Sequence, residues 1–216
     1  MAGNLRRYQA RRVRKAERRG RKKALLLWLI VLIVLGGCVT LFAVNCYGST
    51  AVRLRKLTYP QKYSEYVEKA ARDYSLPPAL IYAVCRTESN FNAEAQSSVG
   101  ARGVMQMMPE TFEWLMEKRG EAGRYTADDL YDPAVCIDYG SYLLRFFYDT
   151  YGSERCAVAA YNAGFVVGDW LQNPNLSPDG VTLENIPYPE TADYVEKVES
   201  AKRAYQQLYE TKNDDG

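Results

Sequence analysis

The chain has 216 residues, with 28 Lys or Arg, 26 Asp or Glu and no histidine. This length allows one domain and an appendage. Because histidine is absent, Ser-His-Asp catalysis, Cys-His catalysis and zinc sites of the H-E-x-x-H type are excluded. The sequence also lacks a Walker phosphate-binding loop and a G-x-G-x-x-G motif. Among the kinds of catalysis considered, acid–base chemistry by a carboxylate therefore remains.

Charge is divided unevenly along the chain. Residues 1–23 hold eleven Lys or Arg and one acid, Glu17, whereas the remainder holds 17 basic and 25 acidic residues, so the net charges are +10 and −8. We interpret residues 1–23 as a basic cytoplasmic tail that orients the chain and meets anionic lipid head groups. A nucleic-acid-binding arm is the alternative, but nucleic acid is not the expected partner of a basic tail in front of an apolar segment.

Residues 24–44 contain no charged residue. As a helix they would rise roughly 31 Å, about the thickness of the hydrocarbon core of a bilayer. We therefore expect a single transmembrane anchor with the N-terminus inside, followed by a juxtamembrane linker, 45–60. Two alternatives stay open: lipidation of Cys38 in an LGGC box, and an ordinary cleaved signal with a weak site at 49–51.

From residue 61 to about residue 210 the pattern is helical, and no alternating strand of convincing length occurs, so we expect one mainly α domain. Ser75 is expected to cap a helix over 76–90 that carries Pro77 and Pro78 in its first turn. The remaining segments follow from apolar periodicity, turn formers and capping signals: helices near 63–74, 110–120, 134–152, 153–164 and 190–209, loops at 125–133 and 173–180, and a polar tail at 211–216.

Five cysteines are present. If Cys136 and Cys156 lie on consecutive antiparallel helices that turn near Gly152, they are offset by roughly 18 Å along the helix axis. A disulfide cannot span that distance, so buried thiols are expected. The spacing and the missing histidine also give no basis for a metal site.

Glu88 ends an apolar stripe on the predicted helix 76–90. It lies seven positions after Ile81, in line with Val84 and Cys85, so it should face the interior. Apolar surroundings raise the pKa of a carboxyl group, which can then act as an acid. The alternative is a helix-end acid that pairs with an arginine such as Arg86 or Arg102.

Five blocks of the sequence resemble the lytic transglycosylases, in the branch related to goose-type lysozyme. In order, they are ES at 88–89, AQS at 95–97, GARGVMQMMPET at 100–111, AAYNAG at 159–164 and IPYPETADYV at 186–195. The resemblance covers roughly residues 65–205. It implies a lysozyme-like helical fold, with a groove for glycan strands of bacterial peptidoglycan and no cofactor.

Matched to the family's motifs, Glu88 corresponds to its sole catalytic acid and base. The resemblance also assigns substrate-binding positions, which are Ser97, Met105, Gln106, Tyr161, Asn162, Glu190 and Tyr194. For Met105 and Tyr161 the alternative is core packing, and for Glu190 it is helix capping. Gly100, Gly103 and Gly164 are expected to serve backbone conformation.

The chain departs from the family mildly at Val104 and Met107, where bulkier aliphatic residues are common, and more strongly in two other places. FVVGDW at 165–170 stands where Gly-Pro is usual, and Ala192 stands where arginine is common, which puts subsite preference in doubt.

The implied reaction cleaves the β-1,4 bond between N-acetylmuramic acid and N-acetylglucosamine and leaves a 1,6-anhydro end, which would serve cell-wall remodelling. The alternatives are a lysozyme-type hydrolase, with Glu94, Asp128 or Asp129 as its base, and a non-catalytic, membrane-tethered glycan-binding scaffold. The expected location is the bacterial cytoplasmic membrane, with the domain on the cell-wall side. Wall-spanning or division machinery is a candidate partner, although no motif names one.

Overall fold

The structure is a computed structural model that describes residues 28, 32–42, 50 and 52–210. The chain divides into two compact units, residues 1–55 and 56–216. In the first unit, residues 32–42 are helical. Within the described part of the chain, no helix has both the length and the apolar character that a membrane crossing requires. The predicted span 24–44 lies partly outside the described residues, and the predicted tails 1–23 and 211–216 lie wholly outside them.

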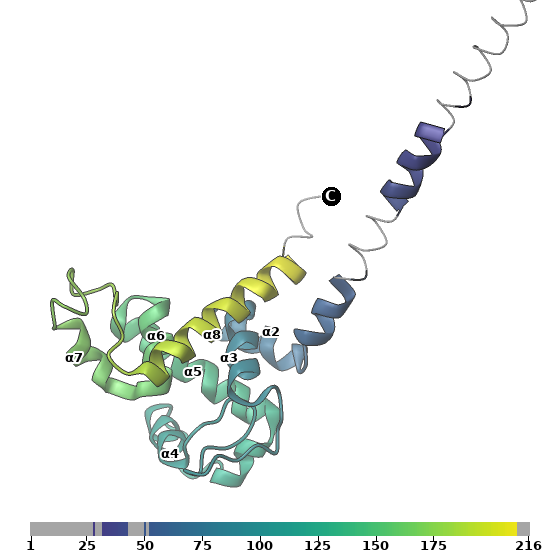
Figure 1. Cartoon of the computed structure of the whole chain (residues 1–216). Helices are drawn as coiled ribbons and strands as arrows, with labels where there is room; N and C mark the ends of the chain where they lie inside the picture. The colour runs from purple at the N-terminus through teal and green to yellow at the C-terminus, as the bar shows by residue number, and fades with distance from the viewer. Residues whose placement is uncertain (1–27, 29–31, 43–49, 51, 211–216) are drawn as a thin grey trace, which may run out of the picture. The chain divides into compact units, whose positions relative to one another are not determined.

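The second unit is built from helices (Figure 1), as the sequence predicted. The α-helices are α2 (Ser64–Tyr74), α3 (Pro78–Ser89), α4 (Pro109–Lys118), α5 (Pro133–Tyr151), α6 (Glu154–Ala163), α7 (Val167–Leu171) and α8 (Pro189–Tyr205). Short 3₁₀ turns occur at η1 (Ala127–Tyr131) and η2 (Gly164–Val166), and a π-helical turn, η3 (Gln206–Glu210), follows α8. Helix α8 packs against α3 and α6, and α5 packs against α2 and α6.

Helix boundaries follow local chemistry, with one correction. Four helices carry proline in the first turn, where its missing N–H group costs little: α3, α4, α5 and α8. Ser75 does not cap α3 as expected; it lies in the left-handed region at the end of α2, where its backbone N–H bonds to the last turn. Pro77 is the extended residue before α3, so three residues, 75–77, separate the helices.

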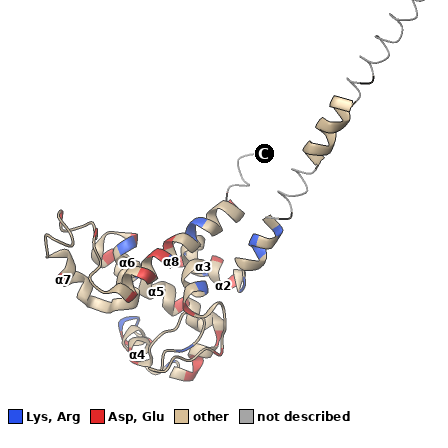
Figure 2. Ribbon diagram, viewed as in Figure 1, with Lys and Arg blue, Asp and Glu red and all other residues tan. Residues whose placement is uncertain are grey.

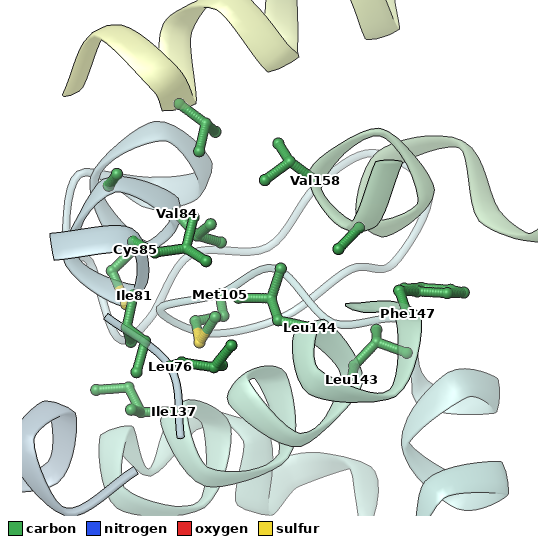
Figure 3. Packing of buried hydrophobic residues seen from close by; sticks show 14 of the residues in the cluster. Leu76, Ile81, Val84, Cys85, Met105, Ile137, Leu143, Leu144, Phe147 and Val158 are labelled. Atoms are coloured by element: carbon green, nitrogen blue, oxygen red, sulfur yellow. The ribbon is translucent and has the colours of Figure 1, made fainter. Parts of the chain in front are cut away.

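The core of the second unit gathers side chains from nearly every helix (Figure 3). Ile81, Val84 and Cys85 of α3 are fully buried, and so is Leu144 of α5. The thiols of Cys85, Cys136 and Cys156 are buried and free, which confirms the expectation that they are not bridged.

Helix α8 positions the site and also anchors the start of the unit. Tyr205 Oη donates to the Pro60 carbonyl at 3.0 Å, and Tyr209 Oη donates to the Tyr59 carbonyl at 2.8 Å. Residues 56–60, which the sequence assigned to the linker, therefore belong to the helical unit. The charged ends of α8 (Figure 2) carry Glu190 in the first turn and Lys202 and Arg203 in the last, a placement that complements the helix dipole.

Candidate active site

Glu88 occupies the last turn of α3. The residues before it on the inward face, Ile81, Val84 and Cys85, are fully buried, as the spacing predicted. Asn90 then ends the helix in the left-handed conformation, and its N–H contacts the Cys85 and Arg86 carbonyls. The carboxylate is therefore fixed at the end of a buried stripe, where the chain turns into a loop.

One side chain that is distant in the sequence contacts the carboxylate of Glu88. Tyr194 of α8 is 8% exposed, and its Oη donates to Glu88 Oε1 at 2.7 Å. Burial raises the pKa of Glu88 from 4.5 to about 7, although the Tyr194 hydrogen bond opposes the rise by favouring the carboxylate. Near neutral pH, Glu88 can thus both give and accept a proton.

The two arginines considered as partners of Glu88 are engaged elsewhere. Arg86 donates through Nε to the Thr58 carbonyl at 3.0 Å and stacks 4.3 Å from the ring centre of Tyr59. Arg102 pairs with Asp128 at 2.7 Å. The helix-end ion pair is therefore wrong for both arginines.

The loop after α3 is closed by hydrogen bonds and carries Gln106. The backbone of Arg102 forms isolated antiparallel β-bridges with Gln96 and with Met107. Ser89 Oγ donates to the Val104 carbonyl at 2.8 Å. Gln106 has a φ of 48°, and its Nε2 donates to the carbonyls of Ala95 and Gly103 at 3.1 and 2.9 Å. The loop is thus tied directly to the end of the helix that bears Glu88.

Ser97, Gly100 and Gly103 shape the same loop, and Gly164 ends α6. Ser97 Oγ accepts from the Ala101 N–H at 3.0 Å, which closes the turn around Gly100. Gly100, Gly103 and Gly164 have φ values of 95°, 75° and 76°, which confirms that these positions need backbone freedom. At Gly103, an added Cβ would lie 1.9 Å from the Leu130 carbonyl oxygen.

Met105 contributes its backbone, and its side chain is in the core. The side chain is 0% exposed and points toward the interior near Ile81 and Leu144 (Figure 3). An added Cβ at Gly140 would lie 2.5 Å from Met105 Sδ, so the thioether fills the space over that glycine. This corrects the expectation that the Met105 side chain lines the groove. The Met105 carbonyl accepts from Tyr161 Oη at 2.9 Å, which ties the loop to α6.

The AAYNAG block, residues 159–164, places the side-chain amide of Asn162 beside α8. Asn162 is exposed on α6, and its Oδ1 accepts from Thr191 Oγ1 at 2.7 Å. Glu190 is exposed in the first turn of α8, which also suits the capping alternative. The sequence did not single out Thr191, which is buried, or Ser89, which bonds the loop to the end of α3. Both lie in blocks that resemble the family, directly beside Glu190 and Glu88, and that position was the signal that could have found them.

The structure thus brings Glu88, Tyr194, Tyr161 and the loop that carries Gln106 together. Asn162, on α6, is bonded to Thr191 at the start of α8. A model of the family described as "Transglycosylase SLT domain" matches residues 65–178. The chain belongs to the transglycosylase SLT domain family.

Relatives of this SLT domain include larger proteins. The chain is 34% identical over 143 residues to the soluble lytic murein transglycosylase of Escherichia coli K12, a match covering 65% of this chain and 22% of that protein. It is 29% identical over 170 residues to the membrane-bound lytic murein transglycosylase C of Actinobacillus succinogenes, covering 68% of this chain and 48% of that relative.

A solved structure shares the fold of the SLT domain. It is an inactive glutamate-to-glutamine mutant of the lytic transglycosylase Slt from Pseudomonas aeruginosa. The TM-score is 0.61 at 30% identity, and the match covers 70% of this chain and 25% of that one. The lysozyme-like, mainly α prediction is therefore confirmed for the helical unit.

Proposed function

We propose that this chain is a peptidoglycan lytic transglycosylase that cleaves the bond between N-acetylmuramic acid and N-acetylglucosamine and leaves a 1,6-anhydromuramic acid end. The observation that carries the proposal is the carboxyl of Glu88, half-buried, bonded to Tyr194 and with a pKa of about 7. A group with that pKa suits both halves of an acid–base cycle near neutral pH. The names of the relatives support this substrate class.

The reaction begins with protonated Glu88. Its proton passes to the bridging oxygen as the bond to C1 of the muramic acid breaks, and the electron pair of that bond stays on the leaving oxygen. The acetamido oxygen of the substrate stabilises the cationic C1. Glu88, now a carboxylate held by Tyr194 Oη, removes the proton from the 6-hydroxyl, whose oxygen closes onto C1. The nucleophile is intramolecular and gains from proximity, and no water is consumed.

Polar groups on both sides of Glu88 would hold the sugars. Because the Nε2 protons of Gln106 are donated to backbone carbonyls, its Oε1 is the group it offers to a hydroxyl or an acetamido N–H. On the α6 side, Asn162 offers Nδ2, since its Oδ1 accepts from Thr191. Ser97 can donate its hydroxyl proton, and Glu190 can accept at the rim from α8. Tyr161 supports the loop through Met105.

The hydrolase alternative needs a second carboxylate to activate water. Each of the three candidate carboxylates either makes another contact or is exposed to solvent. Asp128 pairs with Arg102, and its side chain is 85% exposed. Asp129 accepts from both the N–H and the hydroxyl of Thr126 and so closes the turn η1. Glu94 is exposed in the loop. These contacts favour the transglycosylase.

Product analysis tests the function. Purified peptidoglycan digested with the full chain should release fragments with anhydro ends, which are lighter by one water than reducing ends and separate by mass spectrometry. Predominantly reducing ends would instead establish the hydrolase, and binding of the wall without release of fragments would establish the scaffold.

We infer that residues 24–44 anchor the chain in the cytoplasmic membrane, with the basic tail inside and the SLT domain on the wall side. Support comes from the uncharged segment and its basic flank. The described helical residues 32–42 also expose large apolar side chains such as Leu32, Ile33 and Phe42. Protease added to intact spheroplasts should digest the SLT domain and spare an epitope at the N-terminus, whereas full-length chain in the soluble fraction would contradict the anchor.

A further inference from the structure

Phe165 is held in an exposed position by other rings. It lies in the turn η2, directly after α6, and is 57% exposed. Its ring makes edge-on contacts with Trp114 of α4, at 5.8 Å between centroids, and with Phe146 and Phe147 of α5, at 6.0 and 5.4 Å. A phenyl ring that three other rings orient, and that still faces solvent over half of its surface, is available to a ligand.

These rings border a pocket of about 330 Å³. Its apolar side includes Phe165, Trp114, Phe147 and Leu143, and Glu110 and Thr111 at the start of α4 add polar groups. A pyranose ring presents C–H groups on its faces and hydroxyls at its edge. Aromatic rings can contact the former, while a carboxylate and a hydroxyl bond the latter. The size and lining therefore suit one sugar residue.

Tyr161 connects this pocket to the proposed catalytic acid. It lines the pocket together with Ala160 and Gly164, while its Oη is bonded to the Met105 carbonyl in the loop beside Glu88. Burial raises the pKa of the Tyr161 hydroxyl, and the nearby charge of Glu88 adds to the rise. Tyr161 is therefore shared by the pocket and by the contacts that hold the loop beside Glu88.

We propose that Phe165, backed by Trp114, is the stacking surface of a subsite that binds one pyranose ring of the glycan strand adjacent to the residues cleaved at Glu88. The inference rests on the proposed function, because the strand is its ligand. It assigns a role to FVVGDW at 165–170, the segment that departs from the family's usual Gly-Pro: the bulky ring supplies a sugar contact that Gly-Pro lacks.

Binding without turnover tests the subsite. Titrations would use the full chain in detergent, carrying Glu88→Gln, and purified glycan oligomers of increasing length. Adding Phe165→Ala should weaken binding of the longer oligomers about three- to tenfold and leave a disaccharide unaffected. Phe165→Leu, which keeps apolar bulk without a flat face, should weaken binding similarly, whereas Phe165→Trp should restore it.

The matched control is Tyr66→Ala, which removes an exposed aromatic from α2; it should bind like the parent. Circular dichroism of each variant checks folding, and Phe165→Leu keeps the test open if Phe165→Ala is unstable. The subsite is overturned if both variants bind long oligomers as tightly as Tyr66→Ala, or if the Glu88→Gln parent binds none. The proposed function fails separately, if chain with native Glu88 releases no anhydro ends.

Discussion

Tyr194 and Glu88 are 106 positions apart in the sequence and are joined by a hydrogen bond of 2.7 Å from Tyr194 Oη to Glu88 Oε1. The bond joins α8 to the last turn of α3, two helices that pack directly on each other. It gives a half-buried acid one donor that favours its charged form, while desolvation favours the neutral form. The balance leaves the pKa of Glu88 at about 7, and the pH dependence of activity and of stability tests that value.

Replacing Glu88 by glutamine removes the proton donor and keeps the shape of the side chain. We expect release of anhydro products to fall by about 10²–10⁴-fold, the range for loss of a general acid or base. Circular dichroism should be unchanged. Retention of parental turnover in a correctly folded Glu88→Gln protein would show that another group carries the proton.

Tyr194→Phe removes the hydrogen bond and keeps the ring. Because this bond lowers the pKa of Glu88, its loss should raise that pKa above about 7, and Glu88 should stay protonated to higher pH. The falling alkaline limb of the rate profile should therefore move to higher pH, as measured by release of anhydro ends across pH 5 to 9. An alkaline limb that stays in place or moves to lower pH would contradict the assignment.

Glu88 also makes stability depend on pH. Its pKa is about 7 in the folded chain against an ordinary 4.5, so between these values the folded state holds a proton that the unfolded state has lost. The stabilisation is complete below about pH 4.5 and is lost as pH rises through about 7. Glu88→Gln should therefore exceed the parent in free energy of unfolding by about 1–3 kcal/mol above pH 7.

The difference between the two proteins should shrink toward zero near pH 4. Denaturant unfolding at pH 4 and pH 8 measures it. A gap of equal size at both pH values would mean that Glu88 does not hold an extra proton in the folded state.

Two glycines in the loop separate backbone strain from steric overlap. Both have positive φ, 95° at Gly100 and 75° at Gly103. An added Cβ meets nothing within 4 Å at Gly100 but would lie 1.9 Å from the Leu130 carbonyl oxygen at Gly103. Gly100→Ala should cost about 1–2 kcal/mol from the left-handed backbone alone, and Gly103→Ala about 1–3 kcal/mol more from overpacking.

Thermal and urea unfolding of the two alanine variants compares them directly. Equal stability of both would show that the loop around Gly103 moves away from Leu130 without cost. Because the same loop carries Gln106, Gly103→Ala should also reduce glycan release more than Gly100→Ala does.

The sequence alone determined the helical class and the buried stripe that ends at Glu88. Both depend on a period of 3.6 residues within one element, which neighbouring side chains report directly. The absence of histidine excluded the catalytic and zinc-binding motifs that need it, which composition alone establishes. The offset along consecutive helices likewise ruled out a bridge between Cys136 and Cys156, and the structure agrees.

Only the tertiary structure decided how separate blocks meet. That Tyr194 donates to Glu88, that Tyr161 bonds the Met105 carbonyl and that the Met105 side chain fills the space over Gly140 are contacts between distant elements. Such contacts depend on how helices pack and on the path of the loop, which the pattern within one helix does not specify. The exposed ring of Phe165 is the same kind of case, because the rings that orient it come from α4 and α5.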